Sequence, residues 1–181
     1  MSDSYTLGSH TFRSRLIVGT GKYGSYEQQL TCIRESGADL VTVALRRVDL
    51  NAPKGKGLLD FLPEGVTVLP NTAGCFNVED AVTTARLGRE LLGHSLVKLE
   101  VIGDERTLFP DVAATLEAAR ILVDDGFHPA LASKVDGDDQ RCARQGCELL
   151  FGHRWRDLHG WCRDRWRLGS LVGLSTLHIV G

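Results

Sequence analysis

The stretch Leu96-Val97-Lys98-Leu99-Glu100-Val101-Ile102-Gly103 has the pattern of a buried β-strand that carries two charges. Successive side chains of a strand point to opposite faces of the sheet, so residues two positions apart share a face. One face of this strand is then wholly apolar, whereas Lys98 and Glu100 share the other face, roughly 6.5–7 Å apart along the strand. A charge inside a protein is costly to desolvate unless it is paired or used.

Two interpretations of this charged pair follow from the stretch itself. In the first, Lys98 is a nucleophilic amine and Glu100 is an acid or base beside it. In the second, the segment is an exposed edge strand whose lysine and glutamate form an ordinary surface ion pair. The stretch alone leaves both interpretations open.

The chain around this stretch alternates between short apolar runs and amphipathic segments. Strands are expected at residues 15–21, 40–45, 66–69 and 96–103, and helices at 25–36, at 78–92 and after Pro110-Asp111. Strands that alternate with helices predict parallel βαβ units and therefore the α/β class. In such folds the active groups gather at the carboxyl ends of the strands.

Two strand ends carry cationic side chains that are candidates for contact with an anion. Gly19-Thr20-Gly21-Lys22 has the composition of a phosphate loop, but it lacks the spacing of a nucleotide P-loop, and a tight strand-to-helix turn explains it equally well. Arg46 and Arg47 end the second strand. Because alternation sends them to opposite faces, at most one of them points inward.

The composition excludes several classes of protein. The chain has 181 residues and a formal net charge of −2, which gives no reason to expect a nucleic acid or an anionic membrane surface as a partner. Its first residues lack the features of a signal peptide, and no apolar run is long enough to span a bilayer. The five cysteines have no disulfide-framework spacing, which indicates reduced thiols and a cytoplasmic protein. Cys32 and Cys75 are expected to be core or loop residues rather than nucleophiles.

Five segments occur together in an order and spacing that resemble bacterial thiazole synthase of the thiamine pathway. They are Thr20-Gly21-Lys22-Tyr23, Leu45-Arg46-Arg47, Leu69-Pro70-Asn71-Thr72-Ala73-Gly74, Lys98-Leu99-Glu100-Val101-Ile102-Gly103 and Leu108-Phe109-Pro110-Asp111. Each segment alone is a weak signal, but the five in order are highly specific. The resemblance covers residues 5 to about 127 and implies a (β/α)₈ barrel of the TIM type.

The resemblance also implies a reaction and its partners. Lys98 would form an imine with the ketone of 1-deoxy-D-xylulose 5-phosphate, and Glu100 would match the acid/base glutamate of the family. Sulfur would arrive as a thiocarboxylate on a small ubiquitin-like carrier protein, and dehydroglycine would supply the remaining ring atoms of a thiazole phosphate carboxylate. The family thereby implies a sulfur-incorporating transferase that forms a homo-oligomer, with no cofactor and no metal expected.

The resemblance fails after about residue 127. The expected fifth strand, Phe127 to Lys134, contains Pro129, which is awkward in a central strand. The second catalytic carboxylate and the glycine-rich phosphate loops of the family have no counterpart. We therefore expect residues 1–127 to form the N-terminal half of an incomplete barrel, with about four to six strands in all, and residues 128–181 to form a divergent, poorly ordered tail. The chain alone is expected to turn over poorly or not at all.

The tail allows other readings. All three tryptophans of the chain lie within residues 154–167, and the local composition resembles a frame-shifted reading of GC-rich coding sequence. Soft ligands that could bind zinc occur within 21 residues, but their spacing fits no known finger: Cys142, Cys147, His153, His159 and Cys162. Tryptophans interleaved with arginines suggest stacking on nucleic acid, although Asp157 and Asp164 dilute the positive charge.

Two further functions stay open beside thiazole synthesis. A Schiff-base aldolase of the barrel type would use Lys98 without a sulfur carrier, and a non-catalytic barrel remnant would not use it at all. Trapping a ketone on Lys98 distinguishes the remnant from the two enzymes.

Overall fold

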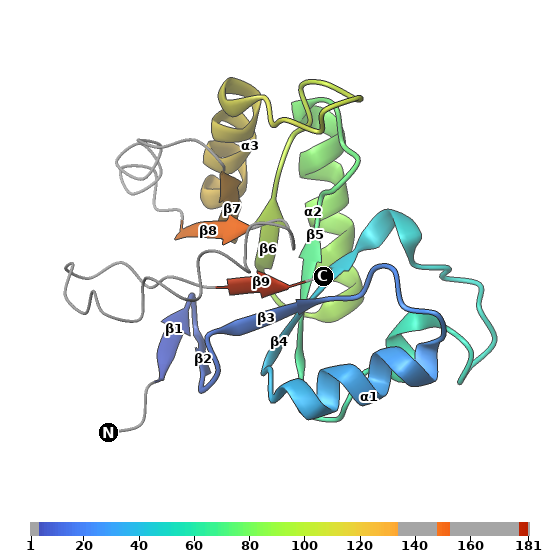
Figure 1. Cartoon of the computed structure of the whole chain (residues 1–181). Helices are drawn as coiled ribbons and strands as arrows, with labels where there is room; N and C mark the ends of the chain where they lie inside the picture. The colour runs from blue at the N-terminus through green and yellow to red at the C-terminus, as the bar shows by residue number, and fades with distance from the viewer. Residues whose placement is uncertain (1–3, 134–147, 153–177, 181) are drawn as a thin grey trace.

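Strands and helices alternate along the chain in the computed structural model, which describes residues 4–133, 148–152 and 178–180 (Figure 1). The strands are β1 (Tyr5–Leu7), β2 (His10–Phe12), β3 (Leu16–Gly19), β4 (Leu40–Ala44), β5 (Thr67–Asn71), β6 (Leu96–Leu99), β7 (His128–Ser133), β8 (Glu148–Gly152) and β9 (His178–Val180). The α-helices are α1 (Tyr26–Ser36), α2 (Val78–Leu92) and α3 (Val112–Asp124), and two short 3₁₀-helices are η1 (Leu45–Arg47) and η2 (Leu58–Phe61).

The strands β3 to β7 pair in sequence order and are all parallel, which confirms the predicted α/β class. The strands β8 and β9 continue this order, and β9 also pairs in parallel with β3. The ladder of parallel strands therefore returns to its first strand. Within the described ranges the ladder has seven strands, more than the four to six expected from the sequence.

The strand β7 begins where the sequence was expected to leave the barrel, and it contains Pro129. This strand pairs with β6 in four register positions, including Val97 opposite Pro129. His128 donates its backbone N–H to Ser95 on the β6 side, so the next residue faces the opposite side of β7, toward β8. Among the described residues, the first pair of β7 and β8 is Ala130 with Glu148, so Pro129 precedes this described ladder and its missing N–H costs none of the ladder's bonds.

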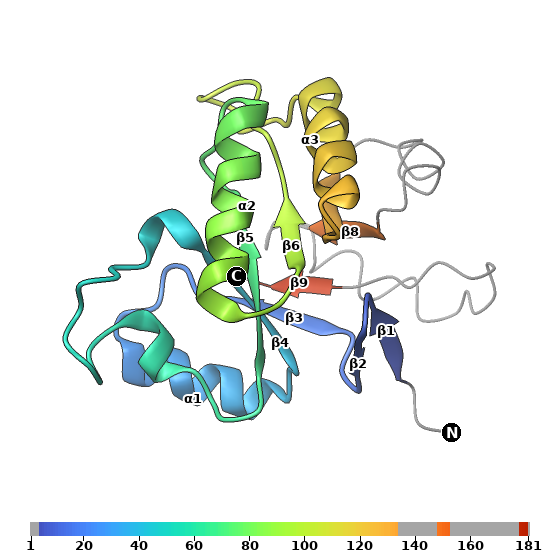
Figure 2. The same ribbon diagram turned by 180° about the vertical axis from the view of Figure 1, so that it is seen from behind.

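The two faces of the parallel sheet have different partners. On one face, β3 and β4 pack against α1, and the strands β6 and β7 pack against α2 and α3, which lie side by side (Figures 1 and 2). Val97 and Leu99 belong to this helix-covered face and are fully buried. Leu96, on the alternate face of β6, belongs to a separate buried cluster that no helix contributes to. The alternation predicted for this stretch is therefore present over β6, which ends at Leu99.

A short antiparallel hairpin, β1–β2, covers the alternate face of the sheet at one end. Its buried side chains Tyr5, Leu7 and Phe12 pack in one cluster with residues of β3 to β7: Ile17, Leu40, Leu69, Leu96 and Ala130. The hairpin was not predicted, although Tyr5-Thr6-Leu7 alternates between apolar and polar and Gly8, with a φ of +57°, makes the turn. This apolar plug leaves the other end of the same face for polar side chains.

The ends of the helices follow the capping chemistry of the sequence. The Ser25 hydroxyl accepts a hydrogen bond from the backbone N–H of Gln28 at the start of α1. The Asn77 side-chain oxygen accepts the backbone N–H of Asp80 at the start of α2. The helices α1 and α2 stop at Gly37 and Gly93, whose positive φ values of 65° and 73° favour glycine. The starts and stops predicted for these two helices are confirmed.

The helix α3 turns a different face to the sheet than its apolar pattern suggests. The sequence indicates a stripe of Val112, Leu116, Ala119 and Val123, whereas the buried residues are Thr115, Ala118, Ala119 and Leu122. The reason is a polar contact, because the Thr115 hydroxyl accepts the backbone N–H of Val101 and donates to the Asp111 carbonyl. A hydrogen bond that fixes a helix face is invisible to a search for apolar periodicity.

Within the described ranges, no helix combines the length and the apolar character that crossing a bilayer requires. The zinc and nucleic-acid readings of the tail rest on Cys142, Cys147, His153, His159, Cys162 and the three tryptophans, all of which lie outside the described residues.

Candidate functional site

Lys98 and Glu100 lie together at the carboxyl end of β6, on the face away from the helices. The Lys98 Nζ atom is 3.3 Å from Glu100 Oε2, and the two atoms form a hydrogen-bonded ion pair. The side chains are 13% and 23% exposed, so the pair is neither sealed in the core nor fully in solvent. This partial burial argues against the alternative of an ordinary surface ion pair.

Glu100 lies just beyond β6, although the sequence predicted a strand that continues to residue 103. Its backbone is held by the side chain of Thr72, a fully buried residue after β5. The Thr72 hydroxyl accepts the N–H of Glu100 at 2.9 Å and donates to its carbonyl oxygen at 2.7 Å. The Thr72 hydroxyl thereby takes the place of a neighbouring strand for the N–H and C=O of Glu100, and it holds the backbone of Glu100 in one position beyond β6.

Replacing Thr72 by valine is expected to destabilise the fold by about 1–3 kcal/mol, because both backbone groups of Glu100 lose their partner in a partly buried place. Thr72→Ser keeps the hydroxyl and serves as the matched control, since it removes only a methyl group. Urea unfolding of the three proteins measures the difference. Equal losses in the valine and serine variants would show that the hydroxyl contributes nothing.

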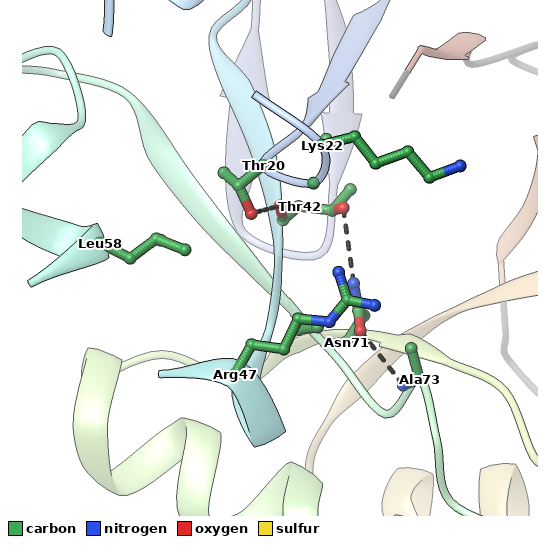
Figure 3. A pocket seen from close by; sticks show the side chains of 10 residues that line it. Thr20, Lys22, Thr42, Arg47, Leu58, Asn71 and Ala73 are labelled. Atoms are coloured by element: carbon green, nitrogen blue, oxygen red, sulfur yellow. Dashed lines mark hydrogen bonds between the residues drawn. The ribbon is translucent and has the colours of Figure 1, made fainter. Parts of the chain in front are cut away.

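A cavity of about 250 Å³ opens beside this pair at the carboxyl ends of β3, β4 and β5 (Figure 3). Its lining residues come from these strand ends, from the turn after β3, from η1 and from η2: Gly19, Thr20, Gly21, Lys22, Thr42, Ala44, Arg47, Leu58, Asn71 and Ala73. Lys98 and Glu100 are not among them. The predicted site pair and the cavity therefore occupy neighbouring strands.

The floor of the cavity is polar and buried. Thr42 is 6% exposed and Asn71 is 7% exposed. The Asn71 side chain donates to the Thr42 hydroxyl at 3.5 Å and accepts the backbone N–H of Ala73 at 3.1 Å (Figure 3). Asn71 is also the register partner of Lys98, so the cavity wall adjoins the strand that carries the amine.

The two arginines after β4 separate as expected, but for a different reason. They lie in the 3₁₀-helix η1 rather than in a strand. Arg47 lines the cavity, whereas Arg46 donates a hydrogen bond to the carbonyl of Gly74. Lys22 also lines the cavity and has a φ of +67°, a conformation that a residue with a Cβ rarely adopts. Two of the three cations that the sequence singled out for contact with an anion, Lys22 and Arg47, thus line the same cavity.

Cys75 is fully buried, and its Sγ lies 3.4 Å from the Thr84 hydroxyl. Burial raises the pKa of the Cys75 thiol, with the Thr84 hydrogen bond acting in the opposite direction. A nucleophilic cysteine needs a lowered pKa, so the environment supports the expectation that this residue is structural. Cys32 lies exposed on α1. Within the ranges that the structure describes, no group of three or more potential metal ligands comes together.

Thr72, Thr42 and Asn71 were not predicted from the sequence as parts of this region. Thr72 and Asn71 belong to the segment Leu69–Gly74, whose asparagine and threonine directly follow an apolar run. A polar pair at a strand end is a signal of a functional edge, and it was available. Thr42 sits inside the apolar run of β4 and offers a weaker signal.

The chain matches the family model of the thiazole biosynthesis protein ThiG over residues 6–148, a range that extends beyond the five motifs. The thiazole synthase of Sorangium cellulosum is 61% identical over 127 residues, which cover 70% of this chain and 49% of that protein. The thiazole synthase of Alkalilimnicola ehrlichii is 57% identical over 153 residues, which cover 82% of this chain and 58% of that protein. The chain therefore spans about half the length of the curated relatives it matches.

The fold is shared with a chain in the crystal structure of the Amycolatopsis orientalis BexX/CysO complex, with a TM-score of 0.67. This likeness covers 97% of this chain and 82% of the other, at 23% sequence identity, so it bears on the fold alone. The motifs, the family model and the close relatives agree, and the chain belongs to the thiazole biosynthesis protein ThiG family.

Proposed function

We propose that this chain carries the imine-forming half of a thiazole synthase, with Lys98 as the nucleophile and Glu100 as its acid/base partner. The observation that carries the proposal is the half-buried ion pair, 3.3 Å between Nζ and Oε2, on the inner face of a strand in a protein of this family. The substrate class is a ketose phosphate, 1-deoxy-D-xylulose 5-phosphate. Dehydroglycine and a carrier thiocarboxylate supply the other ring atoms.

The first steps need only the groups of this pair. A lysine attacks a carbonyl as the neutral amine, and Glu100 is close enough to accept the proton that Lys98 must lose. The nitrogen lone pair then forms a bond to the ketone carbon, and a proton moves from nitrogen to oxygen to give the carbinolamine. Glu100 gives its proton to the carbinolamine hydroxyl, which leaves as water, and the protonated imine forms. Glu100, again a carboxylate, then takes a proton from the carbon beside the imine and returns it to a neighbouring atom, which moves the carbonyl function along the sugar chain.

Architecture and partners extend this proposal. The parallel ladder and the outer helices are those expected of a TIM-type barrel, of which we propose residues 1–127 to be the N-terminal half and residues 128–181 a divergent segment. We propose a ubiquitin-like sulfur carrier as the protein partner, and the structural relative is a chain of a BexX/CysO complex. A homo-oligomer in the cytoplasm completes the proposal.

Reductive trapping tests the role of Lys98 directly. The full-length chain is incubated with 1-deoxy-D-xylulose 5-phosphate and borohydride, which reduces an imine to a stable secondary amine. Peptide mass spectrometry is expected to find the adduct at Lys98 and to lose it in Lys98→Ala. Lys54 and Lys56, which are exposed and lie outside the cavity lining, serve as internal controls for non-specific labelling. An adduct spread evenly over surface lysines would contradict the assignment and favour the non-catalytic alternative.

The aldolase alternative makes a different prediction for the same adduct. A Schiff-base aldolase would trap the ketone at Lys98 and would then cleave or form a carbon–carbon bond without any sulfur carrier. Trapping together with saturable binding of a carrier thiocarboxylate supports the thiazole synthase.

A further inference from the structure

The cavity at the ends of β3, β4 and β5 is cationic, and within the described residues its two cations have no acidic partner. Of its described lining residues, Lys22 and Arg47 are the charged ones, and none is acidic. Across residues 4–133 neither side chain takes part in an ion pair or a side-chain hydrogen bond. Both are exposed to solvent. Their charges therefore face open space that a small ligand can enter.

Neighbouring charges in this region are used differently. Arg46, the residue before Arg47, is bonded to the Gly74 carbonyl and lies outside the cavity lining. The Arg47 guanidinium lies close to Gly21, because a Cβ built on that glycine would be 3.5 Å from Arg47 Nη1. Figure 3 shows the Arg47 side chain and the polar floor of Thr42 and Asn71 within the same space. The cation thus extends over a floor that can form hydrogen bonds.

We propose that this cavity is a binding site for a small oxoanion, held by the guanidinium of Arg47 with Lys22 as a second cation. A guanidinium presents paired N–H donors that match the two oxygens of a carboxylate or of a phosphate. The buried amide of Asn71 and the hydroxyl of Thr42 lie beneath that position. The assignment of the oxoanion to a carboxylate or a phosphate of a substrate rests on the proposed function. The existence of an anion site at Arg47 does not depend on that function.

The position of the cavity gives the bound anion a role. Asn71 pairs in register with Lys98, so the cavity is one strand away from the amine. A substrate that is held at Arg47 by its anionic end directs its remaining atoms along the same sheet face that carries Lys98. This positioning lowers the entropic cost of bringing a carbonyl to the amine.

The test is a titration of the ¹⁵N-labelled full chain with acetate and, separately, with inorganic phosphate, followed by NMR. Neither probe has a carbonyl that can react with Lys98. Saturable shifts are expected at the backbone amides of Gly21 and Lys22. A charge-assisted hydrogen bond contributes enough that Arg47→Gln is expected to weaken binding by about tenfold or more, and Lys22→Gln by about threefold. Tighter acetate binding indicates a carboxylate source, and tighter phosphate binding a phosphate source.

The matched control is Arg46→Gln, which removes a neighbouring guanidinium outside the lining and is expected to change the affinity less than twofold. Since Arg47 is exposed and unpaired among the described residues, its variant should keep the NMR dispersion of the parent chain. Absence of saturable shifts in the parent chain, or equal effects of the Arg46 and Arg47 variants, would overturn the proposal.

Anion binding and imine formation are separable in this design. Lys98→Ala is expected to keep anion binding while it loses reductive trapping. If trapping at Lys98 fails in the parent chain but Arg47-dependent anion binding is measured, the proposed function is wrong and the anion site stands. If the ketone is trapped at Lys98 and no anion binds, the proposed anion site is wrong and the proposed function stands.

Discussion

Glu100→Gln is expected to slow proton exchange at the carbon beside the Lys98-bound ketone by about 10²–10⁴-fold, which corresponds to about 2.7–5.5 kcal/mol of barrier. Glutamine keeps the shape of the side chain, but it cannot take a proton. The geometry makes this test sharp, since Glu100 Oε2 lies 3.3 Å from Lys98 Nζ and its backbone is held independently by Thr72. The measurement is deuterium incorporation from D₂O into 1-deoxy-D-xylulose 5-phosphate, followed by NMR.

The same variant is expected to keep reductive trapping at Lys98, because the amine remains present. Glu105→Gln is the matched control, since Glu105 is an exposed acid in the loop after β6 and is expected to leave exchange unchanged. An exchange rate in Glu100→Gln within about threefold of the parent rate would show that Glu100 is not the acid or base of this step. An unchanged exchange rate in Lys98→Ala would show that the exchange does not depend on an imine at Lys98.

Leu96→Ala is expected to destabilise the fold by about 2–5 kcal/mol, the range for large-to-small changes in a well-packed core. Leu96 is 1% exposed and packs with the β1–β2 hairpin on the sheet face that also carries Lys98. The loss combines the missing apolar contacts with a cavity that rigid strands on several sides cannot close. Thermal or urea unfolding of the full chain measures it.

The control for this change is Leu87→Ala on α2, because Leu87 is 63% exposed. A surface change of this kind is expected to alter stability by no more than about 0.5 kcal/mol. A loss below about 1 kcal/mol in Leu96→Ala would show that the hairpin does not form a packed plug beneath the site.

The local pattern of the sequence was sufficient for the order of the parallel strands and α-helices from residue 15 to residue 124. Period-2 alternation placed Lys98 and Glu100 on one face of β6 and placed Val97 and Leu99 on the helix-covered face. Capping residues such as Ser25 and Asn77 marked the helix starts, because a side-chain oxygen there bonds a backbone N–H only three residues away. These features depend on residues close together in the chain.

The features that the sequence analysis got wrong or missed depend on residues far apart in the chain. Thr72 holds Glu100 across 28 residues, and the pattern of the strand stretch alone predicted regular pairing there. Pro129 is acceptable in β7 because, among the described residues, it lies before the first pair of the β7–β8 ladder, so its missing N–H costs none of the bonds of this ladder. This position depends on the register of the two strands. The Thr115 hydroxyl accepts the backbone N–H of Val101, and this contact orients α3 with a different face toward the sheet than its apolar stripe predicts.

The sequence by itself determined the class of fold, the family and the charged pair on β6. Only the tertiary structure decided that the hairpin plugs one end of the sheet face and that Lys22 and Arg47 line one cavity with Thr42 and with Asn71, which lies on the strand next to β6. The physical reason is that alternation and capping are set by neighbours along the chain. The sharing of one cavity by several strand ends is set by the register and curvature of the whole parallel ladder, which no local pattern encodes.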